Sequence, residues 1–134
     1  MSHTTMKILF LMFLAVLTIF QTAHTCSIVT SEVKIHVINS LPPMSTMRVH
    51  CASGDDELGY HNLSVNEQFQ WGFCPAPRTL FFCHLWWGSK QRSFDVFATK
   101  LIKRTYDNYY WVAASDGIYL SNDYKSFTKK FDWQ

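Results

Sequence analysis

One uncharged apolar segment, residues 79–87 (Thr-Leu-Phe-Phe-Cys-His-Leu-Trp-Trp), constrains the fold of this chain most. Seven of its nine residues are apolar or aromatic, and Thr, Phe and Trp favour β-strands. The segment is too short to span a membrane as a helix, which takes about 20 apolar residues. Side chains alternate between the two faces of a strand, and here both faces carry apolar groups. The segment therefore predicts a strand in the middle of a sheet, covered on both faces or nearly so.

The N-terminus has the composition of a secretory signal peptide. Lys7 precedes an apolar core at residues 8–20, and a short polar stretch with small residues at Ala23 and Thr25 follows. A basic start, an apolar core of about a dozen residues and small residues before the cut are typical of such signals. An uncleaved anchor is the alternative, but the core is short and no basic cluster follows it. We expect residues 1–25 to be removed and the mature chain to be released outside the cell, with no membrane insertion afterwards.

The expected mature chain has the size of one domain. Removing 25 of the 134 residues leaves 109, residues 26–134, which suffices for one modest hydrophobic core. Lys7 leaves with the signal, so the formal net charge falls from +2 to +1. A charge this close to zero, with scattered basic residues, gives no reason to expect binding to nucleic acid or to a membrane surface.

The mature chain shows a succession of short strand-like segments. Turn signals recur roughly every 8–12 residues, which is typical of an all-β sandwich or barrel. The clearest is Asp116-Gly117 between two apolar runs, which predicts a hairpin with a two-residue type I′ turn. We expect seven or eight antiparallel strands and no amphipathic helix. The segments are 33–39, 46–51, 60–65, 68–73, 79–87, 93–98, 109–115 and 118–121, and 124–133 can pack as a last strand.

The cysteine count indicates disulfides. In an oxidising compartment four cysteines suggest two bridges, for which three connectivities exist. The two prolines in residues 75–77 predict a turn into the central strand. If that turn closes a hairpin, Cys83 lies opposite about Gln70, too far from Cys74 for a bond. All four cysteines follow the expected cleavage site: Cys26, Cys51, Cys74 and Cys83.

Two patterns suggest chemistry but fit it poorly. His50-Cys51 and Cys83-His84 supply two Cys and two His, a common set of zinc ligands. Neighbouring residues on a strand point to opposite faces, so each pair offers at most one ligand to a shared site. The acidic run at 55–57 lacks the alternate spacing of a calcium loop. We expect no metal site and no cofactor.

The segment 83–87 resembles part of the His-x-Leu-Trp segment of secreted ribonucleases. It lacks the residue between His84 and Leu85, and the mature chain has no second histidine motif of that kind. Acid–base chemistry on phosphate needs at least a second such group. We therefore predict no catalytic residues and interpret His84 as a strand residue at the edge of an aromatic layer.

One modification signal is present. Asn62-Leu63-Ser64 is an N-glycosylation sequon, which is used only in chains that enter the secretory route. It predicts that Asn62 lies at the surface and carries a glycan.

Several motifs occur in a characteristic order along the mature chain. They are Val-Ile-Asn-Ser-Leu at 37–41, Val-His-Cys-Ala-Ser-Gly-Asp-Asp-Glu-Leu-Gly at 49–59, Phe-x-Trp-x-Phe-Cys at 69–74, Thr-Leu-Phe-Phe-Cys-x-x-Trp at 79–86, Phe-Asp-Val-Phe at 94–97, Trp-x-x-x-x-Asp-Gly-Ile-Tyr-Leu at 111–120 and Phe-Asp-Trp at 131–133. With this order and spacing the chain resembles the plant self-incompatibility S-protein homologue family over essentially its whole mature length.

The resemblance implies a fold and a pairing of the cysteines. The fold is an all-β, small antiparallel β-sandwich of seven to eight strands, stabilised by disulfides. Cys51 and Cys83, in their His-Cys and Phe-Phe-Cys contexts, are the expected pair, and Cys26–Cys74 follows by elimination. The chain departs from many relatives at Tyr109, where they carry a cysteine at or shortly before this position.

The resemblance also implies a function. The best-understood members are stigma proteins that act as ligands for pollen, and most others have no established role. We expect a secreted, non-enzymatic signalling ligand, acting as a monomer and recognised by an unknown cell-surface receptor protein in reproduction or development. The alternative is a secreted carbohydrate-binding or defence module. Loops carry recognition on many rigid sandwiches, so segments 54–59, 88–92 and 99–108 are the candidate binding loops, in no particular order.

Overall fold

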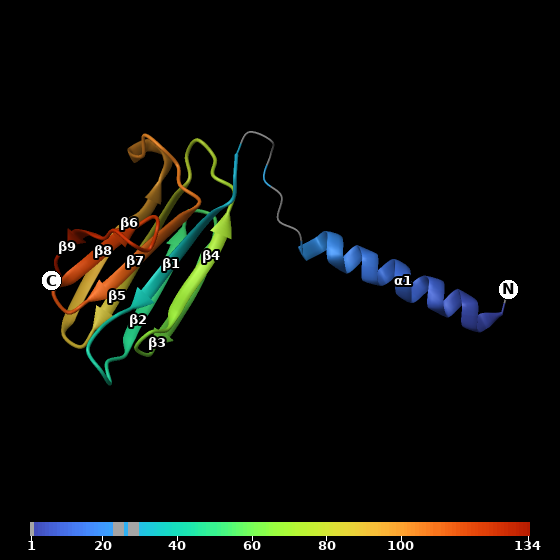
Figure 1. The fold of residues 1–134 in the computed structure, drawn as a ribbon, viewed down its shortest axis with the longest axis horizontal. Helices are drawn as coiled ribbons and strands as arrows, with labels where there is room; N and C mark the ends of the chain where they lie inside the picture. The colour runs from blue at the N-terminus through green and yellow to red at the C-terminus, as the bar shows by residue number, and fades with distance from the viewer. Residues whose placement is uncertain (1, 23–25, 27–29) are drawn as a thin grey trace.

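The chain folds into two β-sheets packed face to face, preceded by a helix (Figure 1). The computed structural model describes residues 2–22, 26 and 30–134. Sheet A has the strand order β4-β1-β7-β8-β9, and sheet B has the order β3-β2-β5-β6. The helix α1 covers His3–Thr22. A search of the described residues finds no helix with the length and apolarity that a membrane span requires.

The strands follow the sequence patterns closely. Two of them, β1 and β4, have the predicted bounds. The strands are β1 (Val33–Asn39), β2 (Met47–Ser53), β3 (Glu57–Leu63), β4 (Gln68–Phe73), β5 (Leu80–Trp87), β6 (Lys90–Ala98), β7 (Asn108–Ala114), β8 (Gly117–Ser121) and β9 (Thr128–Phe131). A short 3₁₀ helix, η1 (Thr99–Leu101), lies between β6 and β7.

The all-β sandwich is confirmed, with nine strands among the described residues. All neighbouring strands pair antiparallel except β1 and β7, which run parallel. The exception follows from the chain path, because residues 99–107 carry the chain from the edge of sheet B to the centre of sheet A. Strand β7 therefore enters sheet A beside β1 in the same direction, and the Lys34 amide donates to the Asp107 carbonyl at 2.8 Å.

The core lies between the sheets and follows the two-residue period of the strands. The ring of Trp111 is buried in it and donates from Nε1 to the Val96 carbonyl at 3.1 Å, which joins β7 to β6 across the sandwich. Such a bond satisfies the indole N–H that burial would otherwise leave without a partner. The buried members are Val33, Ile35, Val37, Leu41, Met47, Val49, Cys51, Leu63, Phe81, Cys83, Leu85, Phe94, Val96, Phe97, Tyr109, Trp111, Ala113 and Ile118.

The turn at residues 75–77 does not close a hairpin. Strand β4 pairs with β1 in sheet A, whereas β5 pairs with β2 and β6 in sheet B. Residues 74–79 thus form an arch from one sheet to the other, and the prediction that Cys83 faces Gln70 is wrong. The arch places Phe73 against Phe81 across the core, with ring centroids 4.6 Å apart.

The hairpin between β7 and β8 is present, but its turn lies one residue earlier than predicted. Ala114 pairs with Gly117, so Ser115 and Asp116 form the turn. Neither has a positive φ among the described residues, which excludes type I′. Gly117 is required for a different reason: a Cβ there would lie 2.6 Å from the Phe131 carbonyl oxygen. The glycine lets β9 approach β8.

One fully buried polar side chain ties the two sheets together. Asn39, at the end of β1, donates from Nδ2 to the Leu63 carbonyl at 2.9 Å and accepts from the Leu41 amide at 2.9 Å. Leu63 ends β3 in the other sheet. Because these groups are buried together, losing the amide would leave polar atoms without partners.

Two disulfides are present, in the pairing that the family resemblance implies. Cys51–Cys83 joins β2 to β5 at directly facing positions, with Cα atoms 4.1 Å apart, and both residues are fully buried. Cys26–Cys74 joins the segment before β1 to the start of the arch. The first bridge fixes the centre of sheet B, and the second holds the N-terminal end of the sandwich.

We expect the double variant Cys51→Ala, Cys83→Ala to lose about 2–4 kcal/mol of unfolding free energy, because the bridge restricts the unfolded chain. Urea denaturation in non-reducing buffer measures the loss. An unchanged unfolding midpoint, or peptide mapping that finds Cys51 free in the native protein, would contradict the prediction. Cys26→Ala with Cys74→Ala is the comparison: its bridge spans 48 residues against 32, so the same argument predicts a loss of similar or larger size from a bridge outside sheet B.

Candidate interaction surface

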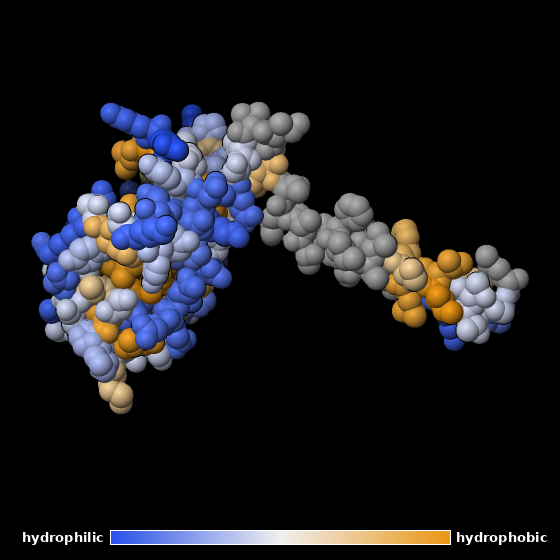
Figure 2. Space-filling view, viewed as in Figure 1, coloured by the Kyte–Doolittle hydropathy of each residue, from blue (hydrophilic) through white to orange (hydrophobic). Residues whose placement is uncertain are grey.

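The outer face of sheet B, the side away from the core, exposes several large apolar and aromatic side chains. Strand β5 lies between β2 and β6, as predicted for a central strand. Its inward residues Phe81, Cys83 and Leu85 are buried, but the expectation that both faces are covered is wrong. On the outer face Leu80 is 42% exposed and Phe82 is 39% exposed. The surface of the sandwich seen in Figure 2 is mostly polar with apolar patches, whereas the helix α1 is largely apolar.

The strand register arranges the outer face in rows. One row runs from Asn62 on β3 through Arg48 on β2 to Trp86 on β5. The next row holds Tyr60, His50 and His84. A third row places Ala52 beside Phe82, and Leu80 lies beyond it at the end of the strand. The face therefore changes along β5, from aromatic and basic groups at one end to aliphatic and phenyl groups at the other.

The rings of the first two rows are packed on one another. Tyr60 stacks on His50 with centroids 4.4 Å apart, and His84 stacks on Trp86 at 3.8 Å. The Arg48 guanidinium carbon lies 4.4 Å from the Tyr60 centroid and 5.7 Å from that of Trp86. Cation–π and stacking contacts of this kind hold side chains in fixed positions on a strand surface. His84 also bonds Gln91 Oε1 through Nε2 at 2.8 Å, so it serves a structural contact.

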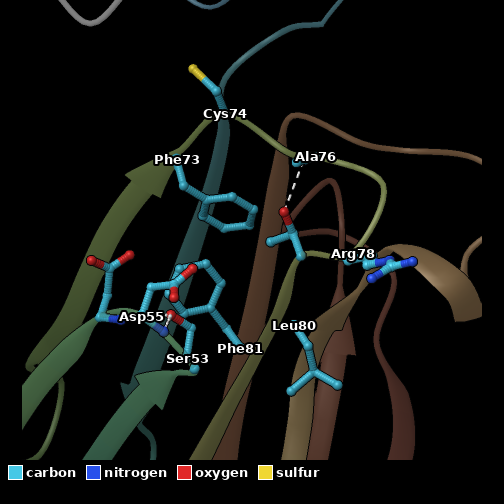
Figure 3. A pocket seen from close by; sticks show the side chains of 11 residues that line it. Ser53, Asp55, Phe73, Cys74, Ala76, Arg78, Leu80 and Phe81 are labelled. Atoms are coloured by element: carbon cyan, nitrogen blue, oxygen red, sulfur yellow. Dashed lines mark hydrogen bonds between the residues drawn. The ribbon is translucent and has the colours of Figure 1, made fainter.

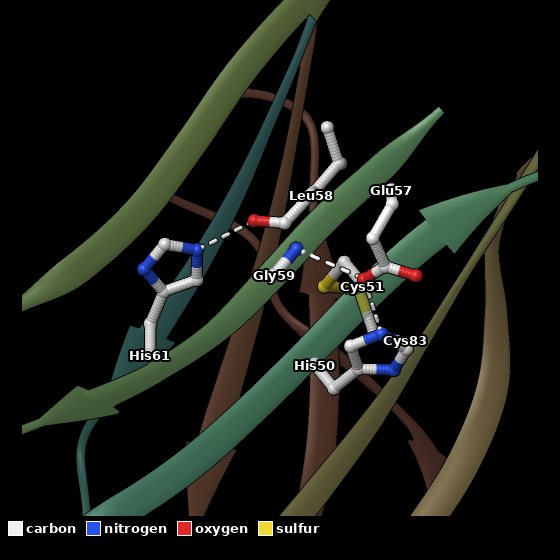
Figure 4. Close-up of polar contacts among 7 residues, drawn as sticks. All are labelled: His50, Cys51, Glu57, Leu58, Gly59, His61 and Cys83. Atoms are coloured by element: carbon white, nitrogen blue, oxygen red, sulfur yellow. Dashed lines mark hydrogen bonds and ion pairs between the residues drawn. A yellow bond between two sulfur atoms is a disulfide. The ribbon is translucent and has the colours of Figure 1, made fainter. Parts of the chain in front are cut away.

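We call the packed side chains of the first two rows, Arg48, His50, Tyr60, His84 and Trp86, the aromatic ladder. A bulge at the start of β3 positions an acidic group beside it (Figure 4). Glu57 Oε1 accepts from the Gly59 amide at 3.0 Å and lies 2.5 Å from His50 Nε2. The bond from the Gly59 amide and, after it, the bond to His50 lower the pKa of the Glu57 carboxyl below its ordinary value. On the other side of β3, His61 Nε2 bonds the Leu58 carbonyl at 2.8 Å.

A pocket of about 460 Å³ opens beside Leu80, between the 54–56 loop and the 74–79 arch (Figure 3). Its floor is aromatic, from Phe73 and Phe81, and charged groups stand on its walls. The 54–56 loop is held by Ser53, whose Oγ accepts from the Asp56 amide at 3.0 Å. The arch is held by Thr79, whose Oγ1 accepts from the Ala76 amide at 2.8 Å. The charged lining residues are Asp55, Asp56 and Arg78.

We call Leu80, Phe82 and the pocket lined by Asp55, Asp56 and Arg78 the rim surface. Its parts come from segments that lie far apart in the sequence and meet because the arch crosses between the sheets. Leu80 lines the pocket, and Phe82 follows it on the same outer face of β5. Apolar side chains beside charged groups match the usual anatomy of a protein interface, an apolar centre with a polar rim.

The predicted binding loops are shorter than expected. Strand β3 begins at Glu57, so only residues 54–56 of the 54–59 segment form a loop. Strand β6 begins at Lys90, so the 88–92 segment reduces to the turn at Gly88 and Ser89. The 99–108 segment holds η1, an irregular connection at 102–107 and Asn108, the first residue of β7. The 54–56 loop is the candidate loop that lines the rim surface.

A second hollow, of about 450 Å³, lies on the outer face of sheet A. His36 is buried there, stacked on Tyr110 at 4.4 Å, and its two ring nitrogens bond Gln68 and Asn108 at 3.0 Å each. Tyr124, in the connection before β9, closes one side. The hollow combines aromatic rings with amide groups. Its other lining residues are Ile38 and Asn66.

Neither surface brings together a set of metal ligands. Across residues 2–22, 26 and 30–134, no group of three or more His, Cys, Asp and Glu side chains is arranged to hold a metal ion. The two cysteines considered as zinc ligands, Cys51 and Cys83, are bonded to each other. Asn62 is exposed on the edge strand β3, and its glycosylation stays a prediction.

Comparison with known families places the chain. The model of the family described as plant self-incompatibility protein S1 matches residues 34–133, nearly all of the sandwich. The chain belongs to this family. S-protein homolog 29 of Arabidopsis thaliana is 31% identical over 100 residues, which cover 73% of this chain and 72% of the relative. S-protein homolog 1 of the same plant is 32% identical over 97 residues, which cover 69% of this chain and 64% of the relative.

A solved structure supports the fold of this S1-family chain. It is described as that of self-incompatibility protein homologues, a widespread family of small, highly stable, secreted proteins from plants. The superposition has a TM-score of 0.62 and covers 78% of this chain and 96% of the solved one, at 20% identity. The similarity extends to the sandwich fold.

We expect Glu57→Gln to make stability less dependent on pH. The Glu57 carboxyl has a lower pKa in the folded state than its ordinary value of 4.5. A lowered folded-state pKa stabilises the protein above the unfolded-state pKa, and the contribution is lost as the pH falls through the folded-state pKa. The variant should be less stable than the native protein at neutral pH, and the difference should shrink below pH 4.5. Urea midpoints measured across this range test it, and a difference that stays constant with pH would contradict it.

Proposed function

We propose that this protein is a secreted, non-enzymatic signalling ligand that acts as a monomer, and that a cell-surface receptor protein recognises its rim surface. One observation carries the proposal: Leu80 and Phe82 stand exposed on a strand that a buried disulfide holds in place, beside a pocket with charged walls. Large exposed apolar groups on a rigid support are typical of docking surfaces.

Secretion is supported by three observations that do not depend on the rim surface. Residues 1–25 have the composition of a signal peptide. Both bridges, Cys26–Cys74 and Cys51–Cys83, belong to an oxidising compartment. The structural relative is described as a secreted plant protein. A receptor protein is the partner that a small extracellular ligand of this kind requires.

The apolar and the charged groups of the rim surface contribute to binding in different ways. Desolvating Phe82 and Leu80 supplies affinity, since apolar and aromatic anchors dominate most interfaces. Asp55, Asp56 and Arg78 supply specificity, because charges at a rim select complementary partners and affect the association rate more than the affinity. The disulfide and the Ser53 and Thr79 bonds hold these groups in place before binding, which reduces the entropy lost on binding.

We expect Phe82→Ala to weaken binding to plant cells about fivefold or more, as for an anchor residue whose loss costs over about 1 kcal/mol. The measurement is saturable binding of labelled protein to cells that respond to it, and protease treatment of those cells should abolish the binding. Phe127→Ala is the matched control, because Phe127 is 43% exposed but lies in the connection before β9 of sheet A. Equal affinities of Phe82→Ala and Phe127→Ala would rule out the rim surface as the docking site.

A second candidate function is a carbohydrate-binding module, which the hollow on sheet A favours. Tyr110 and Tyr124 offer rings, and Asn66 and Gln68 offer amides, the groups with which proteins usually hold sugars. A glycan array separates the two functions. Glycan binding that Tyr124→Ala removes and Phe82→Ala leaves unchanged would favour the carbohydrate-binding module. Cell binding that protease treatment abolishes and Phe82→Ala weakens would favour the signalling ligand.

A further inference from the structure

We propose that an N-linked glycan on Asn62 lies folded over the outer face of sheet B, against Tyr60 and Arg48, and forms part of the folded structure. The inference rests on the secretory route of the proposed function but not on the receptor. It concerns the end of the face opposite the rim surface.

The direction of the Asn62 side chain follows from its neighbours on β3. Leu63 is buried in the core, and His61 stacks on Phe69 with centroids 3.9 Å apart. Both therefore point inward, and alternation sends Tyr60 and Asn62 to the outer face. Both of these residues are exposed, and Tyr60 is 58% exposed. A sugar attached to Asn62 begins on the same face as the aromatic ladder.

Two groups lie within reach of the first sugar, and a third lies one strand farther away. Arg48 is the direct cross-strand partner of Asn62, a position about 5 Å away between Cβ atoms. Tyr60 is two residues away on the same face, about 7 Å along the strand. Trp86 is the next residue in the row beyond Arg48. Asn62 therefore stands at the edge of a platform formed by one guanidinium and two aromatic rings.

The chemistry of this platform suits N-acetylglucosamine, the sugar linked to asparagine. One face of the sugar ring carries C–H groups that pack against aromatic rings, and its hydroxyl and acetamide oxygens accept hydrogen bonds from a guanidinium. Tyr60 is 58% exposed although Arg48 and His50 lie against its ring, each at 4.4 Å. The C–H groups of the sugar would pack against the part of Tyr60 that these neighbours leave open, and its oxygens would accept from Arg48. The platform thus exists before the glycan is added, which lowers the entropy lost when the sugar settles on it.

A glycan on Asn62 would also hinder pairing of sheet B with a strand of another molecule. Strand β3 is an edge of sheet B, and an unpaired edge can pair with a strand of another molecule. Asn62 is the last but one residue of β3, and a glycan there would hinder such pairing at that end of the edge. Because Phe82 lies four residues from Trp86 on β5, about 13 Å away, the glycan covers one end of the face and leaves the rim surface open.

The test is a double-mutant cycle on protein secreted from plant or insect cells. Mass spectrometry establishes the occupancy of Asn62, and an endoglycosidase trims the glycan to a single N-acetylglucosamine. Ser64→Ala removes the sequon but keeps Asn62. The unfolding equilibrium is measured in urea with and without the sugar, in the native background and in Tyr60→Ala.

We expect the single sugar to stabilise the native background roughly two- to tenfold in the folding equilibrium constant, the range of one aromatic contact. The gain should vanish in Tyr60→Ala and persist in Tyr124→Ala, a matched control whose tyrosine is 52% exposed near sheet A. Tyr60→Thr replaces Tyr60→Ala if the latter does not fold, since Thr keeps the strand preference.

Two results would overturn the inference. One is a secreted protein without a glycan on Asn62, and the other is an equal gain from the sugar in Tyr60→Ala and in the native background. Either result leaves the receptor proposal standing, because the rim surface does not include Asn62. Retention of the full chain inside the cell would instead remove the secretory route, and the proposed function would fail together with the inference.

Discussion

The disulfide between Cys51 and Cys83 fixes the register of β2 against β5, and the surface of the molecule depends on that register. Side chains alternate along a strand, so a slip by one residue would exchange the inward and outward sets of β5. The bond joins directly facing residues and prevents this. With Cys83 inward, the core receives Phe81 and Leu85. The outward residues are then Phe82, His84 and Trp86.

The same register determines which groups meet on the outer face. The pairing of β2 with β5 places Arg48 opposite Trp86, so the two side chains are in contact. It also places Ala52 opposite Phe82, and the small alanine side chain leaves the phenyl ring exposed. The gradient from a packed aromatic ladder to exposed apolar side chains is therefore a consequence of one covalent constraint. The arch contributes the second constraint, since its crossing to sheet B brings Arg78 and the 54–56 loop to the same pocket.

Much of the fold can be predicted from local pattern, and most of the candidate surface cannot. The bounds of β1 and β4 follow from alternation and turn residues, which are local. Whether residues 74–79 close a hairpin or form an arch depends on which sheet buries Phe73, and no local pattern contains that information. The turn before Gly117 shows the same limit, because the glycine is needed to avoid a clash with the Phe131 carbonyl, which is distant in the sequence. An apolar run such as 79–87 likewise predicts burial on both faces, although the pairing leaves Leu80 and Phe82 in solvent.

The two ends of the outer face of sheet B differ in how many packing contacts their side chains already make. At the Asn62 end, Tyr60 has Arg48 and His50 against its ring, so a protein partner would gain little from covering it and would have to displace packed neighbours. At the rim surface, Phe82 and Leu80 still expose apolar area, and removing that area from water stabilises a complex by about 25 cal/mol per Å² before the costs of association. A receptor therefore gains most at the rim surface, whereas a sugar attached to Asn62 can pack on the exposed part of Tyr60 and bond to Arg48 without displacing either side chain. A glycan on Asn62 and a receptor at Phe82 can then occupy one sheet face together.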